Sequence, residues 1–273
     1  MKKKNYLIFD FGASSGRGAV AEFDGEQFDL KVIHRFDNRP VSADKTLYWD
    51  ILRLFSELKI GTQLAAKTYE NSISSLGIDT WGVDFGFIDK NGKLISNPIH
   101  YRDKSRNSVG EELFRIIPER ELFNLTGGQL VSEVSLFNMF HLKNSDAPEL
   151  TCASKFLMTP DIFNYFLTGI VSNEFTMATT TLMFNQKEKK WQEKILEKLN
   201  IPKEIFNDVI DPGTKIGNIT DYVCEDLGIK TIPIIAPATH DTASAVTGIP
   251  VTSKNKKWAF ISIGTWCTLG KPE

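Results

Sequence analysis

The sequence predicts an α/β fold, and three observations support this prediction. Short apolar runs that resemble strands fill the first forty residues, apolar residues at helical spacing dominate the middle of the chain, and strand-like runs return after residue 230. Strands and helices that follow one another in this way are typical of α/β proteins. The length of 273 residues allows one large domain or two ordinary ones.

The N-terminal part is predicted to form three strands and then a helix. Residues 6–9 and 19–23 are apolar runs, and residues 28–34 alternate with the period of two that strands have. Asp24-Gly25 before the third strand indicates a hairpin turn. Residues 50–69 predict a helix because their apolar residues fall mostly on one face.

Two more strands are predicted at residues 75–79 and 83–88, and a turn follows at residues 89–93. Residues 105–199 are predicted to be mainly helical. Four segments there carry apolar residues at three-to-four spacing: 113–117, 136–142, 162–167 and 191–199. The chain then becomes turn-rich after Pro202.

Near the C-terminus, the sequence predicts a short buried strand at residues 232–236, a helix at 242–246 and a last strand at 258–263. Residues 258–265 weakly resemble residues 6–13, because each is an apolar run led by an aromatic residue that ends in glycine and a small residue. This similarity would fit the start of a second copy of the first fold.

Composition and charge exclude several classes of protein. Lysine and arginine number 32 and aspartate and glutamate 34, so the net charge of −2 argues against a nucleic-acid surface. No apolar run approaches the roughly 20 residues of a membrane span, and the run behind the basic N-terminus is too short for a secretory signal. The three cysteines lie far apart, which predicts neither a disulfide framework nor a zinc site. We therefore expect a cytoplasmic protein without a membrane or nucleic-acid partner.

The segment DFGASSGR, residues 10–17, lies between two predicted strands. Its glycines allow several backbone N–H groups to point to one side, which is how protein nests bind phosphate oxygens. Its serines add hydroxyl donors, its arginine adds a positive fork, and its aspartate could hold magnesium. The segment lacks the glycine spacing of a P-loop or a Rossmann loop, and from spacing alone a simple glycine–serine hairpin fits as well.

The segment THDTASA, residues 239–245, follows the predicted strand at 232–236. Its Asp241 would lie at the carboxyl end of a strand, where open α/β sheets bind ligands. There the carboxylate could accept a proton from a hydroxyl nucleophile. An aspartate at the start of a helix can also be only a cap, and the residues alone leave both interpretations open.

The segment DTWGVDF, residues 79–85, joins two predicted strands. Trp81 could cover the apolar face of a sugar, and Asp84 could bond sugar hydroxyls. A core tryptophan in a turn between strands is the other interpretation.

Together these segments resemble the FGGY family of carbohydrate kinases, and most closely its rhamnulokinase-type members. The matching motifs follow the family's order: DFGASSGR (10–17), GIDTWGVDF (77–85), YRD (101–103), TMATTT (176–181), THDTASAV (239–246) and GTW (264–266). The resemblance implies an actin-like ATPase domain of the ribonuclease H type, with a mixed sheet flanked by helices and normally in two copies around a cleft. It also implies that ATP phosphorylates the ketose L-rhamnulose, giving L-rhamnulose 1-phosphate.

The resemblance also implies a role for individual residues. Asp241 would be the catalytic base, and Asp10 would hold Mg²⁺. The residues implied to bind ATP phosphates are Gly12, Ala13, Ser14, Ser15, Gly16, Arg17, Gly264 and Thr265. The residues implied to bind the substrate are Trp81, Gly82, Asp84, Gln129, His240, Asp241 and Thr242.

The sequence departs from the family pattern in two ways. Ile263 stands before Gly264, where the family usually has a small polar residue. Family members are also nearly twice as long, and their second domain carries the adenosine pocket. We therefore expect residues 1–252 to form the N-terminal domain and residues 253–273 to begin a C-terminal nucleotide-binding domain. The strand at 258–263 would then lack sheet partners, and the chain alone would be nearly inactive.

Three alternative functions remain open at this stage. One is a kinase for another deoxy-ketose, such as L-fuculose. Another is a sugar-binding module without catalysis. The third is a metal-dependent phosphohydrolase built on His240 and Asp241, although His34, His100 and His141 show no metal-ligand spacing with one another.

Overall fold

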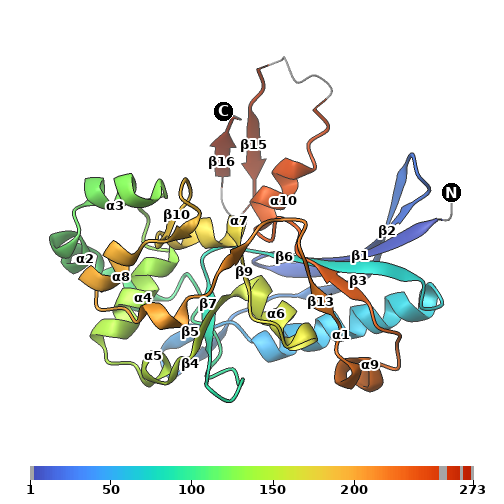
Figure 1. The fold of residues 1–273 in the computed structure, drawn as a ribbon, viewed down its shortest axis with the longest axis horizontal. Coiled ribbons are helices and arrows are strands. Elements are labelled where there is room, and N and C mark those ends of the chain that lie inside the picture. The colour runs from blue at the N-terminus through green and yellow to red at the C-terminus, as the bar shows by residue number, and fades with distance from the viewer. Residues whose placement is uncertain (1–2, 252–256, 265–266, 272–273) are drawn as a thin grey trace.

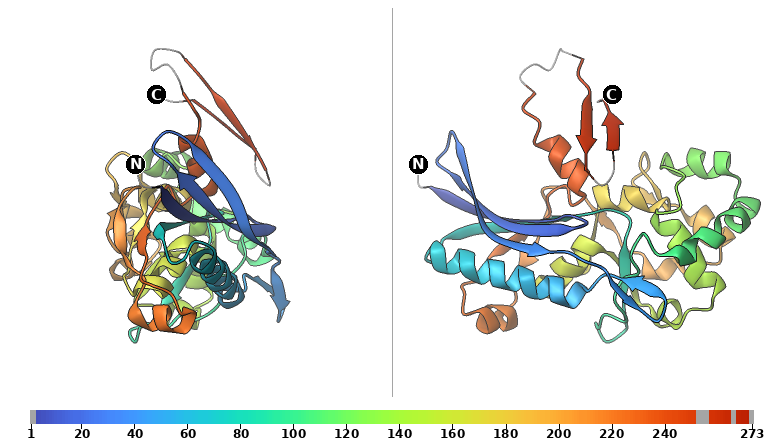
Figure 2. Two further views of the ribbon diagram at one scale, coloured as in Figure 1. Left: turned by 90° about the vertical axis from the view of Figure 1, so that its right-hand side faces the viewer. Right: turned by 180° about the vertical axis from the view of Figure 1, so that it is seen from behind.

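The computed structural model describes residues 3–251, 257–264 and 267–271 of the chain. A twisted sheet forms one part of the molecule, a mainly helical region forms the other, and a C-terminal hairpin projects away from the body (Figure 1). The rear view shows one long helix, residues 51–68, running along one face of the sheet (Figure 2).

The central sheet has six strands in the order β13-β14-β6-β1-β2-β3 within the described residues. β1, β2 and β3 are antiparallel, β1 pairs in parallel with β6, β6 pairs in parallel with β14, and β13 is antiparallel to β14. The bounds are β1 (Lys4–Phe11), β2 (Ser15–Phe23), β3 (Phe28–Asp37), β6 (Ile73–Thr80), β13 (Lys215–Asn218) and β14 (Pro233–Ile235). This mixed sheet confirms the predicted α/β architecture.

Helix α1 (Ile51–Thr68) packs against β1, β2 and β3, and α6 (Thr159–Thr168) packs against β6 and β13. Asp50 caps α1, because its carboxylate accepts a hydrogen bond from Arg53 N at 3.1 Å. Gly61 lies in the middle of α1, although glycine disfavours a helix interior by about 1 kcal/mol. A Cβ there would stand 2.7 Å from the ring of Phe9, so the glycine lets the helix approach the sheet closely.

The helical region has a hydrophobic core of its own. β7 (Phe85–Ile88) and β8 (Lys155–Met158) pair in an antiparallel ladder and supply Phe85, Phe87 and Phe156 to this core. The helices of the region are η1 (Lys104–Ser108), α2 (Gly110–Ile116), α3 (Glu119–Thr126), α4 (Ser135–Asn144), α5 (Pro148–Cys152), α7 (Phe175–Ala178), η2 (Thr179–Thr181), α8 (Glu193–Lys198) and η3 (Lys203–Ile205). The predicted helical character of residues 105–199 is therefore confirmed in its main part.

Short strands and two further helices complete the described structure. The strands are β4 (Val41–Ala43), β5 (Thr46–Tyr48), β9 (Asn173–Glu174), β10 (Phe184–Asn185), β11 (Lys190–Trp191) and β12 (Val209–Ile210). The helices are α9 (Asp221–Leu227) and α10 (Asp241–Thr247). No helix of residues 3–251, 257–264 and 267–271 has both the length and the hydrophobicity that a membrane span needs.

One sequence-based expectation about local structure is wrong. Val83 does not begin a strand: its φ of 69° is left-handed, which is unusual for a β-branched residue, and β7 begins only at Phe85. The segment after Pro202 is turn-rich, as expected, and it also contains β13 and α9.

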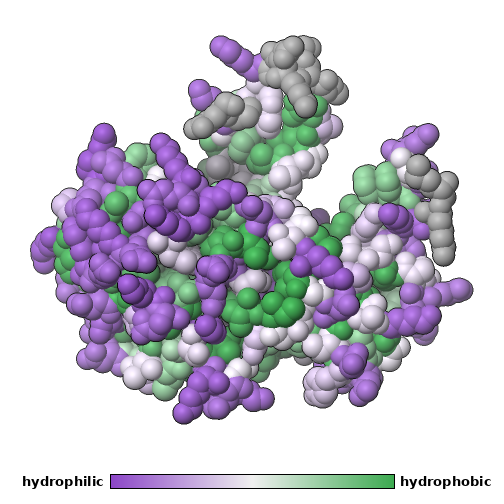
Figure 3. All heavy atoms as spheres, viewed as in Figure 1, coloured by the Kyte–Doolittle hydropathy of each residue, from purple (hydrophilic) through white to green (hydrophobic). Residues whose placement is uncertain are grey.

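The projecting hairpin consists of β15 (Phe260–Ile263) and β16 (Cys267–Gly270), which pair with each other in an antiparallel ladder. The expectation that the strand at 258–263 lacks a partner is therefore wrong. Ile261, Ile263 and Leu269 of this hairpin are 63%, 81% and 74% exposed. Hydrophobic side chains are visible on it, whereas hydrophilic side chains cover much of the helical region (Figure 3).

Candidate active site

A cavity of about 790 Å³ opens where the carboxyl ends of β1 and β6 and the start of α10 meet the helical region. The site residues predicted from the sequence that line it are Asp10, Gly12, Ala13, Ser14, Ser15, Arg17, Trp81, Gly82, Gln129, His240, Asp241, Thr242 and Gly264. Segments more than 200 residues apart in sequence therefore lie side by side. Thr265, the remaining residue of the predicted second phosphate loop, lies outside the described residues.

The first predicted phosphate loop is a tight turn between β1 and β2. Gly12 N donates to Ser15 O at 2.9 Å, and Asn38 Nδ2 donates to Gly12 O at 2.8 Å. Arg17 faces Asp10 across the two strands, with Nη2 2.9 Å from Oδ2. The loop therefore presents a fixed backbone and an ion pair to the cavity.

Gly16 does not line the cavity, although a phosphate contact was expected there. A Cβ at Gly16 would stand 2.2 Å from the ring of Phe36. Gly16 is therefore needed because the ring of Phe36, on the neighbouring strand β3, leaves no room for a side chain.

Asp241 is the first residue of α10, which follows β14. Its Oδ1 accepts from Thr242 N at 2.5 Å and from Thr242 Oγ1 at 3.1 Å, and it lies 3.4 Å from His240 Nε2. Its side chain is 39% exposed, so the carboxylate is accessible from the cavity. Burial lowers the pKa of His240, while the charge of Asp241 opposes this shift. The pair thus combines a neutral imidazole with an accessible carboxylate.

Asp79 also lines the cavity, although no role was predicted for it from the sequence. It is the next-to-last residue of β6 and lies directly beside Asp10 of β1 in the parallel register. Burial raises the pKa of Asp79 well above its usual range, and the charges of Asp10 and Asp241 add to the shift, whereas a hydrogen bond with Ser244 opposes it. The parallel pairing of the two strands was the signal that could have identified this residue.

Asp84, which was expected to contact the substrate, does not line the cavity. Its side chain is fully buried, and its Oδ2 accepts from Trp49 Nε1 at 2.5 Å, Trp81 Nε1 at 3.1 Å and Tyr101 N at 3.2 Å. Arg106 Nη2 lies 3.5 Å from its Oδ1. Asp84 therefore holds two tryptophans and the backbone behind the cavity wall, and it is Trp81 that reaches the cavity.

Trp81 belongs to a stack of rings. The centroids of Trp81 and Trp49 are 3.9 Å apart, and those of Trp49 and His100 are 4.0 Å apart. Burial lowers the pKa of His100 to about 4 from the usual 6.5, and the charges of Arg102 and Arg106 contribute. His100 is therefore neutral in the folded protein at neutral pH.

We expect the stability of the fold to fall between pH 6.5 and pH 4 because of His100. The unfolded chain binds this proton more tightly than the folded chain, so the contribution is complete above pH 6.5 and is lost as the pH falls through this window. The difference amounts to roughly 2–3 kcal/mol at pH 4.5. Urea unfolding at pH 7 and pH 4.5 should show a smaller acid loss for His100→Gln than for the unmodified chain. Equal losses in the two chains would contradict this account.

The helical region supplies the opposite wall of the cavity. Gly127, Gly128 and Gln129 follow α3, and Thr179 and Thr180 lie in η2. The apolar part of this wall consists of Val131, Val134 and Leu182, with Val83 from the loop before β7. The wall therefore offers both hydrogen-bonding groups and an apolar patch.

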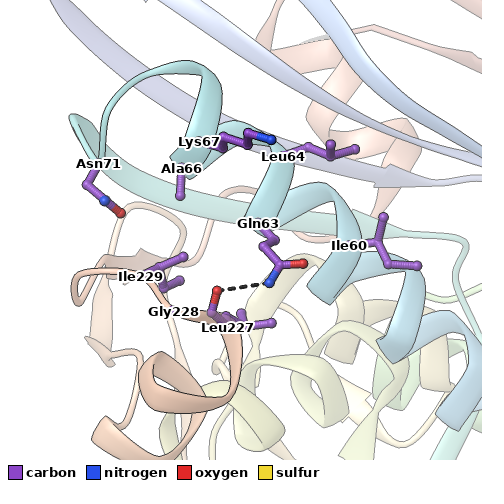
Figure 4. Close-up of a pocket in the computed structure, with 9 residues that line it drawn as sticks. All are labelled: Ile60, Gln63, Leu64, Ala66, Lys67, Asn71, Leu227, Gly228 and Ile229. Atoms are coloured by element: carbon purple, nitrogen blue, oxygen red, sulfur yellow. Dashed lines mark hydrogen bonds between the residues drawn. The ribbon is translucent and has the colours of Figure 1, made fainter.

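A second cavity of about 580 Å³ lies between α1 and the end of α9 (Figure 4). Gln63 Nε2 donates to Leu227 O at 3.0 Å across it, and Lys67 is the single charged residue in its lining. The described residues contain no group of three histidine, cysteine, aspartate or glutamate side chains arranged to hold a metal. The first cavity, which Asp10, Arg17 and Asp241 line, is the candidate active site.

Comparison with known proteins agrees with this geometry. Residues 5–248 match the model of the N-terminal domain of the FGGY family of carbohydrate kinases. Rhamnulokinase of Bacteroides thetaiotaomicron is 37% identical over 268 residues, which cover 98% of this chain and 55% of that protein. Rhamnulokinase of Oceanobacillus iheyensis is 37% identical over 264 residues, covering 97% and 55%. The chain thus spans about half the length of the curated relatives it matches.

Solved structures share the fold at lower identity. A carbohydrate kinase from Novosphingobium aromaticivorans superposes with a TM-score of 0.81 at 16% identity, over 100% of this chain and 56% of that one. Gluconate kinase from Lactobacillus acidophilus gives 0.78 at 18% identity, over 88% and 48%. These neighbours confirm the expected fold, and the match of the family model over most of the sequence shows that the chain belongs to the FGGY family of carbohydrate kinases.

Proposed function

We propose that the chain is the sugar-binding and catalytic part of an ATP-dependent kinase that converts L-rhamnulose to L-rhamnulose 1-phosphate. The observation that carries the proposal is the accessible carboxylate of Asp241 in the same cavity as the Gly12–Arg17 loop. The rhamnulokinases at 37% identity support the choice of sugar.

Asp241 acts as the general base in this proposal. Phosphoryl transfer needs an aligned hydroxyl and a nearby group that takes its proton. Hydrogen bonds from Thr242 N and Thr242 Oγ1 fix one carboxylate oxygen of Asp241. The other oxygen is left to accept the proton of the sugar hydroxyl.

The loop between β1 and β2 binds the phosphates of ATP through backbone N–H groups, the hydroxyls of Ser14 and Ser15, and the guanidinium of Arg17. Asp10 fits a magnesium site, because Mg²⁺ is usually bound by one or two carboxylates together with substrate phosphates. When bound, Mg²⁺ would neutralise charge on the phosphates. Gly264, which follows β15 in the projecting hairpin, contributes its backbone to the same phosphate site.

The sugar lies between the Trp81 loop and the helical region. His240, Thr242 and Gln129 provide polar groups, and Gly82 leaves room beside His240. A Cβ at Gly82 would stand 3.0 Å from His240 Nε2. The apolar patch of Val83, Val131, Val134 and Leu182 suits the methyl group of a 6-deoxy sugar.

The patch suits L-fuculose as well, so a kinase for that 6-deoxy ketose is the alternative proposal. Measurement of ADP release and calorimetric titration should compare L-rhamnulose, L-fuculose and L-fructose, which differs from L-rhamnulose only by a hydroxyl on the terminal methyl. We expect the highest kcat/KM for L-rhamnulose and a large loss with L-fructose. In a chain that includes the proposed second domain, binding of the ketoses without any ADP release would support a sugar-binding module instead.

We also propose that residues 253–273 begin a second, nucleotide-binding domain. The relatives are about twice as long, and the hairpin of β15 and β16 leaves large apolar side chains exposed. Exposed apolar patches commonly mark an interface. The 273 residues alone should therefore release ADP far more slowly than a chain that includes such a domain, because closure over the phosphates excludes water and aligns the reactants. Equal rates would contradict the domain boundary.

Charge reversal at Arg17 tests the phosphate loop. Arg17→Glu should raise the KM for ATP much more than the KM for the ketose, because a carboxylate would then face the phosphates beside Asp10. Arg35→Glu is the matched control, since Arg35 is the neighbour of Arg17 on β3, is exposed and does not line the cavity. A shift in the ketose KM alone would assign the loop to the sugar.

A further inference from the structure

A buried carboxylate, Glu174, connects the helical region to the segment that carries the catalytic base. We propose that Glu174 and Thr176 are positioning residues that clamp Thr239 and His240 and thereby set the place of Asp241. This inference rests on the proposed role of Asp241 as the base.

Glu174 is fully buried and gathers its donors on one oxygen, Oε2. From α7, that oxygen accepts from Thr176 N at 3.0 Å, Thr176 Oγ1 at 2.6 Å and Met177 N at 3.3 Å. From the catalytic segment, it accepts from Thr239 N at 3.1 Å and Thr239 Oγ1 at 2.7 Å. A single side chain thus joins the start of α7 to the backbone two residues before Asp241.

Thr176 extends the connection by one residue. Its hydroxyl donates to Glu174 and accepts from His240 N at 3.2 Å. The backbone N–H groups of Thr239 and His240 are therefore both bound by the Glu174–Thr176 pair. On the other side, Thr80 N at the end of β6 donates to Thr239 O at 2.9 Å. The segment is held from two directions.

Asp241 has no comparable anchor of its own within the described structure. The hydrogen bonds to its carboxylate come from the adjacent Thr242, and His240 Nε2 lies 3.4 Å away. Such contacts move together with the segment and do not fix it relative to the cavity. The distance between Asp241 and the sugar therefore depends on the backbone of residues 239 and 240.

Glu174 and its neighbour are also bound to the rest of the helical region. Its N–H donates to Asp161 Oδ2 at 3.4 Å, and β9 pairs with β12. The neighbouring Asn173 is also buried and bonds both Met158 N and Phe156 O. Since Thr179 and Thr180 of the following turn line the cavity, the clamp aligns the sugar-facing wall and the base with each other.

The test uses Thr176→Val, which keeps the shape and removes the hydroxyl, with Thr176→Ser as the conservative variant. Thr181→Val is the matched control, because its buried hydroxyl bonds Ala178 O and Met183 N and does not touch the catalytic segment. The readouts are amide hydrogen exchange at Thr239 and His240, thermal unfolding, and kcat and KM for L-rhamnulose.

We expect Thr176→Val to speed exchange at His240 and to lower kcat about tenfold to a hundredfold, as for a small misplacement of a reacting group. The ketose KM should change much less. Thr176→Ser should restore the exchange rate at His240 and kcat. Thr181→Val should lower stability without changing the exchange rate at His240 or kcat. Should Thr176→Val fail to fold, Glu174→Gln takes its place with the same readouts.

Unchanged exchange at His240 in a folded variant would overturn the clamp, and faster exchange with an unchanged kcat would overturn its role in positioning. Exchange does not depend on turnover. If an unmodified chain that includes the proposed second domain phosphorylates no ketose, the proposed function fails, whereas the exchange result still decides whether the clamp exists.

Discussion

In a chain that includes the proposed second domain, replacement of Asp241 by asparagine is expected to lower turnover by roughly two to four orders of magnitude, the usual range for loss of a general base. Asparagine keeps the shape and the oxygen that Thr242 binds, but it cannot take the proton of the sugar hydroxyl. Binding of L-rhamnulose should persist, because Trp81, Gln129 and His240 are unchanged. ADP release measures the first effect and calorimetric titration the second.

Asp221→Asn is the matched control for this variant. Asp221 is also the first residue of a helix, α9, and does not line the cavity. Asp221→Asn measures the effect of losing one negative charge at the start of a helix. This loss should lower the free energy of unfolding by less than about 1 kcal/mol. Near-normal turnover of Asp241→Asn would show that Asp241 serves only the start of α10, which is the structural interpretation that the sequence left open.

The sequence predicted those elements that depend on local signals. The strands β1, β2, β3 and β6 and helix α1 carry clear alternation or helical spacing, so their existence was evident from the residues. β13 was missed because Lys215–Asn218 has little alternation and is a strand only through its pairing with β14. Local pattern cannot show such a partner.

Val83 shows how tertiary contacts override propensity. Valine has a high strand propensity, so a valine after a glycine favours the start of a strand. Its N–H donates to Thr180 Oγ1 at 3.1 Å, and its carbonyl accepts from Ser135 Oγ at 2.6 Å. These contacts from the helical region hold the residue in the left-handed conformation, which costs of the order of 1–3 kcal/mol.

The candidate site could be predicted in its segments but not in every side chain. The motifs located the loops, and the parallel strands bring their ends together. The sequence could not tell which carboxylate of the segment 79–85 faces the cavity, because the turn at Val83 breaks the alternation between Asp79 and Asp84. Asp79 therefore lines the cavity, whereas Asp84, for which this was expected, does not.

The buried pair of Asp84 and Arg106 should give the largest effect on stability. Asp84→Ala is expected to lower the free energy of unfolding by about 3–5 kcal/mol, because it leaves the Arg106 guanidinium buried without its carboxylate. The change also removes the acceptor of both indole N–H groups of Trp49 and Trp81. Urea unfolding at pH 7.5 measures the loss.

The size of the loss depends on the unpaired charge, and this can be tested directly. The double variant Asp84→Ala with Arg106→Met should be more stable than Asp84→Ala alone, since no buried charge then remains without a partner. Glu111→Ala breaks the exposed pair with Arg115 and should cost no more than about 1 kcal/mol. A cost for Asp84→Ala as small as that of Glu111→Ala would show that water reaches Arg106. The wall behind Trp81 would then be less firmly packed than the hydrogen bonds to Asp84 indicate.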